Sequence, residues 1–123
     1  MVHSVNYAKQ HGFIDAVYVT TDDNDIKHIA LQHGALVIDR PNELAGDLEP
    51  TVTALKHVLQ SIDDDIENIV LLQPTNPLRP KYLLAETLQL FIEKDYDSLF
   101  TVSRNHQKFG TINEDVFKPF NYK

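Results

Sequence analysis

The stretch that decides the fold runs Leu71-Leu72-Gln73-Pro74-Thr75-Asn76-Pro77-Leu78-Arg79. It continues an apolar run from Ile69, which predicts a strand over residues 68–73 that is buried on both faces. Two prolines then end the strand, because proline has no N–H to donate to a sheet. In an open α/β sheet, ligands bind at the loops that follow the carboxyl ends of strands. The pattern therefore predicts a ligand-binding loop or, as the alternative, a rigid turn before a helix.

Two earlier segments repeat this arrangement of an apolar strand followed by a polar loop. Strands predicted over 16–21 and 35–38 run into Thr21-Asp22-Asp23 and into the segment 40–47, Arg40-Pro41-Asn42-Glu43-Leu44-Ala45-Gly46-Asp47. Helices are expected over 2–12, 23–33, 50–61 and 81–94, a further strand over 97–102, and a short hairpin within 109–117. Alternating strands and helices favour a mostly parallel sheet with helices on its faces. We therefore expect an α/β fold, three-layered α/β/α, in a single domain over residues 1–123.

Local signals place the ends and faces of these helices. Asp22 or Asp23 is expected to cap the helix over 23–33, and Gly34 to close it. Pro50 falls near the start of the next helix, where its missing donor costs nothing. The apolar side chains expected on buried helix faces are Ile26, Ile29, Ala30, Val52, Leu55 and Leu59.

Composition excludes several classes of function. A net charge of −7 argues against a general nucleic-acid binder, and no apolar run reaches the length of a membrane span. The chain has no cysteine, which is typical of a cytoplasmic protein. Three adjacent carboxylates over 63–65 cannot easily converge on one ion, and His28 and His33 have the wrong spacing for a shared metal face on a helix. No metal site and no catalytic residue are therefore assigned within this chain.

The three polar loops together resemble the acylneuraminate cytidylyltransferases, also called CMP-sialic acid synthetases. That family shows S/T-T-D-D, then R-P-x-x-L-A-x-D, then L-L-Q-P-T-S-P-L-R, in this order and at nearly this spacing. The resemblance covers about residues 17–103, with Asn76 in place of the usual serine, and a weaker match to a bacterial branch runs from Lys108 to Lys123. It implies a fold like that of the nucleotide-diphospho-sugar transferases.

The resemblance also implies roles for particular residues. On the nucleotide side, Arg40 would hold the cytidine end of CTP, with Asp22, Glu49 and Thr51 lining the same pocket. The alternatives are a salt bridge from Arg40 to Asp39 or Asp47, and a simple helix cap for Thr51.

On the sugar side, Gln73 would contact the incoming sugar, with Thr75 and Asn76 adding hydrogen bonds. Glutamine both donates and accepts, which suits hydroxyls and an N-acyl group. The alternative is that Gln73 ties down its own loop. Arg79 is expected to be structural, pinning this loop to the sheet or to a helix C-terminus.

Parts of the family pattern are not found in these residues. The family's glycine-rich loop A-R-x-G-S-K, which holds the triphosphate, and its D-I-D metal-binding region would lie outside residues 1–123. The chain then resembles an incomplete catalytic domain, and Mg²⁺ is expected as the family's cofactor without ligands in this chain. A central strand between those over 16–21 and 68–73 would also be absent. We therefore expect a rearranged sheet, a second chain that fills the gap, or a chain that is one piece of a longer product.

The function implied is CTP-dependent formation of a CMP-activated nonulosonate, a nine-carbon acidic sugar of the sialic acid type, with release of pyrophosphate. Such chemistry belongs to cell-surface polysaccharide biosynthesis in the cytoplasm, with a homodimer as the expected assembly. The alternative is a catalytically inactive fragment folded as an intertwined, strand-swapped oligomer. A KDO-type enzyme and a flavodoxin-like binding domain are further alternatives, and neither explains all three loops.

Overall fold

A computed structural model describes residues 1–46, 49–104, 106–107 and 109–120. Asp47 and Lys108, both named in the sequence motifs, and residues 121–123 lie outside the described residues. The chain divides into two compact units, Met1–Ala85 and Glu86–Lys123. The prediction of a single domain over 1–123 stays a prediction.

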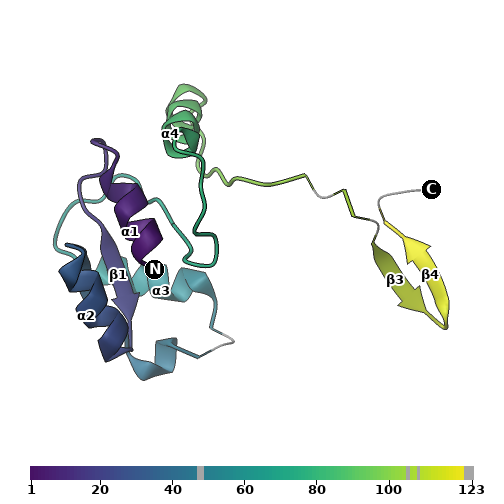
Figure 1. The fold of residues 1–123 in the computed structure, drawn as a ribbon, viewed down its shortest axis with the longest axis horizontal. Coiled ribbons are helices and arrows are strands. Elements are labelled where there is room, and N and C mark those ends of the chain that lie inside the picture. The colour runs from purple at the N-terminus through teal and green to yellow at the C-terminus, as the bar shows by residue number, and fades with distance from the viewer. Residues whose placement is uncertain (47–48, 105, 108, 121–123) are drawn as a thin grey trace. The chain divides into compact units, whose positions relative to one another are not determined.

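The N-terminal unit is built on one parallel strand pair with helices packed against it (Figure 1). Strand β1 is Tyr18–Thr21 and β2 is Leu36–Asp39, joined by helix α2, Asn24–Gln32. Their register pairs Tyr18 with Leu36 and Thr21 with Asp39. This is a strand–helix–strand unit, and it confirms the α/β class and the two strands predicted over 16–21 and 35–38.

The local signals of α2 act as predicted. The Asp23 carboxylate accepts hydrogen bonds from the amides of Asp25 and Ile26, each at 2.8 Å, and so caps the helix. Gly34 follows the helix with φ +70°, a conformation that costs glycine little. Helix α1, Val2–Lys9, ends earlier than the predicted Gly12.

The core of this unit is small. Its central cluster is Val5 of α1, Ala30 of α2 and Ala35, which are 2%, 0% and 3% exposed. Partly buried side chains from both strands and the N-terminus pack around it, namely Met1, Val17, Val19 and Val37. Because only a few large side chains are enclosed, stability depends heavily on each of them.

The strand predicted over 68–73 is wrong, and so is the one over 97–102. Neither segment forms a strand, and Ile69 and Leu71 are each about half exposed. No backbone hydrogen bond to another described residue is made by residues 62–72. A strand exists only through its ladder partners, and an apolar run alone does not provide them.

Helix α3, Thr51–Gln60, forms where expected but none of its residues is buried. Val52 is 53% exposed, so the prediction of a buried face through Val52, Leu55 and Leu59 is wrong for this structure. Ile26 and Ile29 of α2 are also exposed, so the prediction that they lie on a buried helix face is wrong as well. A sheet that included residues 68–73 would cover these helix faces, but those residues form no strand.

Two further elements complete the chain. Helix α4, Leu83–Glu93, matches the helix predicted over 81–94, and a 3-10 turn, Asn42–Leu44, follows β2. In the C-terminal unit, β3, Gly110–Asn113, pairs antiparallel with β4, Val116–Pro119, which confirms the predicted hairpin. The two turn residues, Glu114 and Asp115, both have positive φ, as tight two-residue hairpins require. No described helix is long and apolar enough to cross a membrane.

Candidate functional site

The carboxyl ends of β1 and β2 bring Asp22 and Arg40 together. The Arg40 amide donates to the Thr21 carbonyl at 3.0 Å, which extends the ladder one residue past β2. This register places the two side chains beside each other, with Arg40 Nη2 3.6 Å from Asp22 Oδ1. Two loops far apart in the sequence therefore meet at one edge of the strand pair, as parallel pairing predicts.

Arg40 has donor groups left for a ligand. Its side chain is 25% exposed, and its contact with Asp22 is longer than a good hydrogen bond. Its Nε atom is buried and has no hydrogen-bond partner among the described residues. A guanidinium presents five N–H groups in a rigid fork. Arg40 can therefore donate to a carbonyl or a phosphate without breaking a strong existing contact.

The alternative of a salt bridge from Arg40 to Asp39 is wrong. Asp39 instead forms a salt bridge with Lys27, whose Nζ lies 2.6 Å from Oδ1 and 2.7 Å from Oδ2. Lys27 lies one turn into α2, four residues after the cap Asp23, on the side that reaches β2. Sequence reasoning missed this pair, although the helical spacing after Asp23 was a usable signal. The Asp47 alternative lies outside the described residues.

Glu49 and Thr51 are exposed residues at the start of α3. The Glu49 amide donates to the Gly46 carbonyl at 3.0 Å. Pro50 occupies the cap position, and no side chain caps α3. The alternative of Thr51 as a simple helix cap is therefore wrong, and its hydroxyl lies at the first helical position, where backbone N–H groups are left over.

Gln73, Thr75 and Asn76 lie together in an exposed turn. The Asn76 amide donates to the Gln73 carbonyl at 3.3 Å. The same carbonyl accepts a hydrogen bond from Arg79 Nη2 at 2.6 Å, while Arg79 Nη1 donates to Ser4 Oγ at 3.0 Å. Arg79 is thus structural, as expected, but it pins the loop to α1. No hydrogen bond or ion pair between described residues joins this turn to the Asp22–Arg40 edge.

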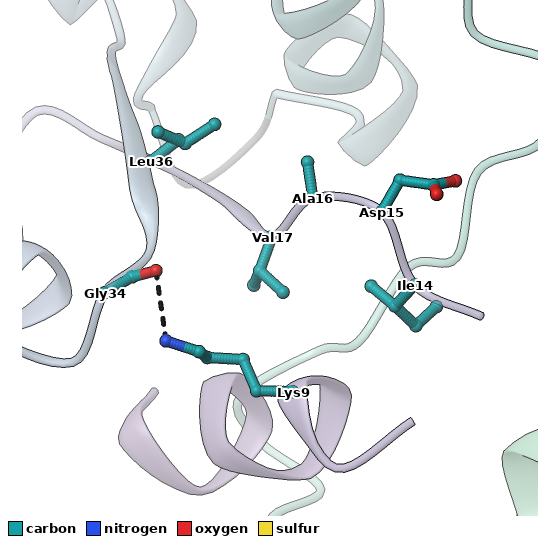
Figure 2. Close-up of a pocket in the computed structure, with 7 residues that line it drawn as sticks. All are labelled: Lys9, Ile14, Asp15, Ala16, Val17, Gly34 and Leu36. Carbon is teal, nitrogen blue, oxygen red and sulfur yellow. Dashed lines mark hydrogen bonds between the residues drawn. The ribbon is translucent and has the colours of Figure 1, made fainter. Parts of the chain in front are cut away.

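A pocket among the described residues lies elsewhere. Its volume is about 280 Å³, and it is lined by Lys9, Ile14, Asp15, Ala16, Val17, Gly34 and Leu36. These residues precede β1 and β2 or begin them, so the pocket is at the amino ends of the strands. Figure 2 shows Lys9 reaching across it, where its Nζ donates to the Gly34 carbonyl at 3.3 Å and to that of His33 at 3.1 Å.

Lys9, which lines this pocket, has a structural role. Its ammonium satisfies carbonyls at the end of α2, which are left without partners inside a helix. Ligands of parallel α/β units bind at the opposite ends of the strands. We therefore take the Asp22–Arg40 edge, and not this pocket, as the candidate site.

No group of three or more metal-ligating side chains occurs among the described residues. Asp22 and Asp39 lie at the same strand edge, but both have cationic partners. The described residues therefore do not fit a Mg²⁺ site.

Comparison with known proteins identifies the family. The family model described as "Cytidylyltransferase" matches residues 1–119. N-acylneuraminate cytidylyltransferase of Escherichia coli O18:K1:H7 is 35% identical over 109 residues, which is 87% of this chain and 26% of that protein.

Two other relatives extend the comparison. The N-acylneuraminate cytidylyltransferase of Streptococcus agalactiae serotype V is 29% identical over 94% of this chain and 29% of its own length. N-acylneuraminate cytidylyltransferase A of Danio rerio is 30% identical over 83% of this chain and 24% of its own length. The chain thus spans about a quarter of the length of the curated relatives it matches. Because the family model covers nearly all of its residues, the chain belongs to the cytidylyltransferase family.

Proposed function

We propose that this chain provides the cytidine-binding edge and the sugar-binding loop for transfer of a cytidylyl group to a nonulosonate. The observation that carries the proposal is Arg40, held beside Asp22 at the carboxyl ends of β1 and β2 with donors to spare. The relatives named above are N-acylneuraminate cytidylyltransferases, which favours CTP and a sialic acid type of sugar as the substrates.

In this reaction the anomeric hydroxyl of the sugar attacks the α-phosphorus of CTP. A new oxygen–phosphorus bond forms, the bond to the β-phosphate oxygen breaks, and pyrophosphate leaves. The hydroxyl proton is lost to a base that we do not assign to this chain. The contribution of these residues is to bind and orient, which reduces the entropic barrier to the attack.

The nucleotide side of the site uses charge and free donors. Arg40 is proposed to donate to the cytosine carbonyl or to a phosphate oxygen, since charge-assisted hydrogen bonds are the stronger kind. Glu49 and the hydroxyl of Thr51, at the start of α3, are proposed to contact the same nucleotide. Asp22 is proposed to hold the Arg40 guanidinium in place through their ion pair.

The sugar side uses the turn after residue 72. The exposed Gln73, Thr75 and Asn76 offer an amide, a hydroxyl and a second amide on one short turn. These groups both donate and accept, so they match the hydroxyls and N-acyl group of a nonulosonate. The backbone of Gln73 is already fixed, which leaves its side chain to meet the ligand.

The three-layer α/β/α arrangement, the homodimer and the cytoplasmic location are part of the proposal. The three-layer arrangement is supported by the parallel β1–α2–β2 unit and by the exposed apolar residues Ile69, Val70 and Val52. Sedimentation of the chain at several concentrations measures the assembly, and a mass above that of one chain supports the dimer.

The proposal predicts that CTP at about a hundred times its dissociation constant raises the melting temperature of this chain by about 10–20 °C, whereas UTP, ATP and GTP at the same concentration do not. A ligand that binds only the folded state stabilises it by about 2.7 kcal/mol at a hundred times its dissociation constant. For a domain of this size each kcal/mol corresponds to about 4–8 °C. Equal shifts with all four nucleotides would indicate phosphate binding without recognition of cytosine. No shift with any of them would contradict the proposal for this chain and favour the inactive-fragment alternative.

A further inference from the structure

Helix α1 holds the residues that follow the proposed sugar-binding turn, and Arg79 links those residues back to Gln73. Arg79 lies after the turn and makes two hydrogen bonds through opposite ends of its guanidinium. Nη2 donates to the Gln73 carbonyl at 2.6 Å, and Nη1 donates to Ser4 Oγ at 3.0 Å. The guanidinium carbon also lies 5.9 Å from the centroid of the Tyr7 ring. One side chain thus joins the turn to two residues of α1.

The second anchor is the hydroxyl of Tyr7. It donates to the Pro80 carbonyl at 2.9 Å and accepts from the Leu84 amide at 3.2 Å. Tyr7 is 8% exposed and Leu84 7% exposed, so these bonds are shielded from water. They fix the chain where it enters α4.

The anchoring residues of α1 are themselves rigidly held. Ser4 is 8% exposed, and its neighbour Val5 is at the centre of the core. The Tyr7 ring also packs edge-on against His11, with centroids 5.0 Å apart. Because these residues are held by the core, contacts with them restrict the motion of the loop.

The turn that precedes these anchors has little freedom of its own. Pro74 and Pro77 fix two backbone φ angles. The Gln73 carbonyl already accepts from two donors, the Asn76 amide and Arg79. Both lone pairs of that carbonyl are therefore occupied, and rotation of the peptide would break two hydrogen bonds.

From these contacts we infer that Arg79, with Ser4 and Tyr7 of α1, is a positioning residue that preorganises the Gln73–Asn76 turn for the sugar. Arg79 does not itself contact the ligand in this proposal. Its planar fork reaches two partners at once, which a lysine ammonium at the end of a flexible stem does not reproduce. Preorganisation raises affinity because the cost of ordering the loop is met before binding. The sugar part of this inference rests on the proposed function, while the ordering of the turn does not.

The first test measures order without any ligand. In the ¹⁵N-labelled full chain, amide relaxation of Gln73, Thr75 and Asn76 is compared in wild type, Arg79→Gln, Arg79→Lys and Ser4→Ala. We expect rigid amides in wild type, with order parameters near 0.85, falling below about 0.6 in Arg79→Gln. Arg79→Lys and Ser4→Ala should fall in between. Lys81→Gln is the matched control, because it removes a nearby exposed charge. A turn that stays as rigid in Arg79→Gln as in wild type would overturn the inference.

The second test measures affinity. Titration with N-acetylneuraminate is expected to show at least tenfold weaker binding in Arg79→Gln, while the dissociation constant for CTP changes less than twofold. Equal losses for both ligands would mean general unfolding and would contradict a positioning role. If wild type binds neither ligand, the proposed function fails, and the relaxation result still decides whether Arg79 orders the turn.

Discussion

Replacing Arg40 with alanine is expected to weaken CTP binding between about tenfold and a hundredfold. The guanidinium in our account makes charge-assisted hydrogen bonds to the nucleotide, and such bonds contribute about 1.5–3 kcal/mol. Calorimetric titration of the variant with CTP measures the loss. Arg40→Lys should recover only part of it, because an ammonium cannot reproduce the paired donors.

The same change should hardly alter stability. The only ion pair of Arg40 with a described residue is the 3.6 Å contact to the partly exposed Asp22. Exposed ion pairs contribute about 0–1 kcal/mol. Lys56→Ala is the control, since it removes the same charge from an exposed position on α3. Equal losses of CTP affinity in both variants would reduce the role of Arg40 to general electrostatics.

Replacing Val5 with aspartate is expected to unfold the N-terminal unit. Val5 is 2% exposed and contacts a cluster that offers no partner for a charge. A buried, unpaired carboxylate costs several kcal/mol, which is comparable with the whole stability of a small domain. Circular dichroism at 222 nm should show loss of helical signal or a melting transition lowered by at least about 15 °C.

Val52→Asp is the matched control for this substitution. Val52 is also a helical valine but is 53% exposed, in the first turn of α3. A negative charge there interacts favourably with the helix dipole, so stability should change by less than about 0.5 kcal/mol. Similar destabilisation by both substitutions would mean that the α3 face is packed in solution, contrary to this structure.

The elements that could be predicted from the sequence are those with signals inside a few residues. Asp23 and Gly34 bracket α2, and Pro50 precedes α3, so each helix was found near its observed bounds. The segment 68–73 has a strong strand composition but no pairing partner among the described residues. Strand formation depends on distant residues, and propensity does not supply them.

In the candidate site, too, some features follow from local sequence signals and others depend on distant residues. The meeting of Asp22 with Arg40 follows from two parallel strands ending at one edge, which the sequence pattern indicated. The choice of Lys27 as the partner of Asp39 depends on how α2 crosses the strands. The tie between Arg79 and Ser4 spans 75 residues and has no local signal. Tertiary packing decides such contacts.

The most direct test of the central claim is an amide-shift map of the ¹⁵N-labelled chain titrated with CTP. Our account predicts that the largest shifts occur at Thr21, Asp22, Arg40 and Thr51, at the carboxyl ends of the strands and the start of α3. UTP at the same concentration should produce clearly smaller changes. Shifts centred instead on Lys9, Asp15 and Gly34, the pocket at the amino ends, would contradict the account, and so would the absence of any shift.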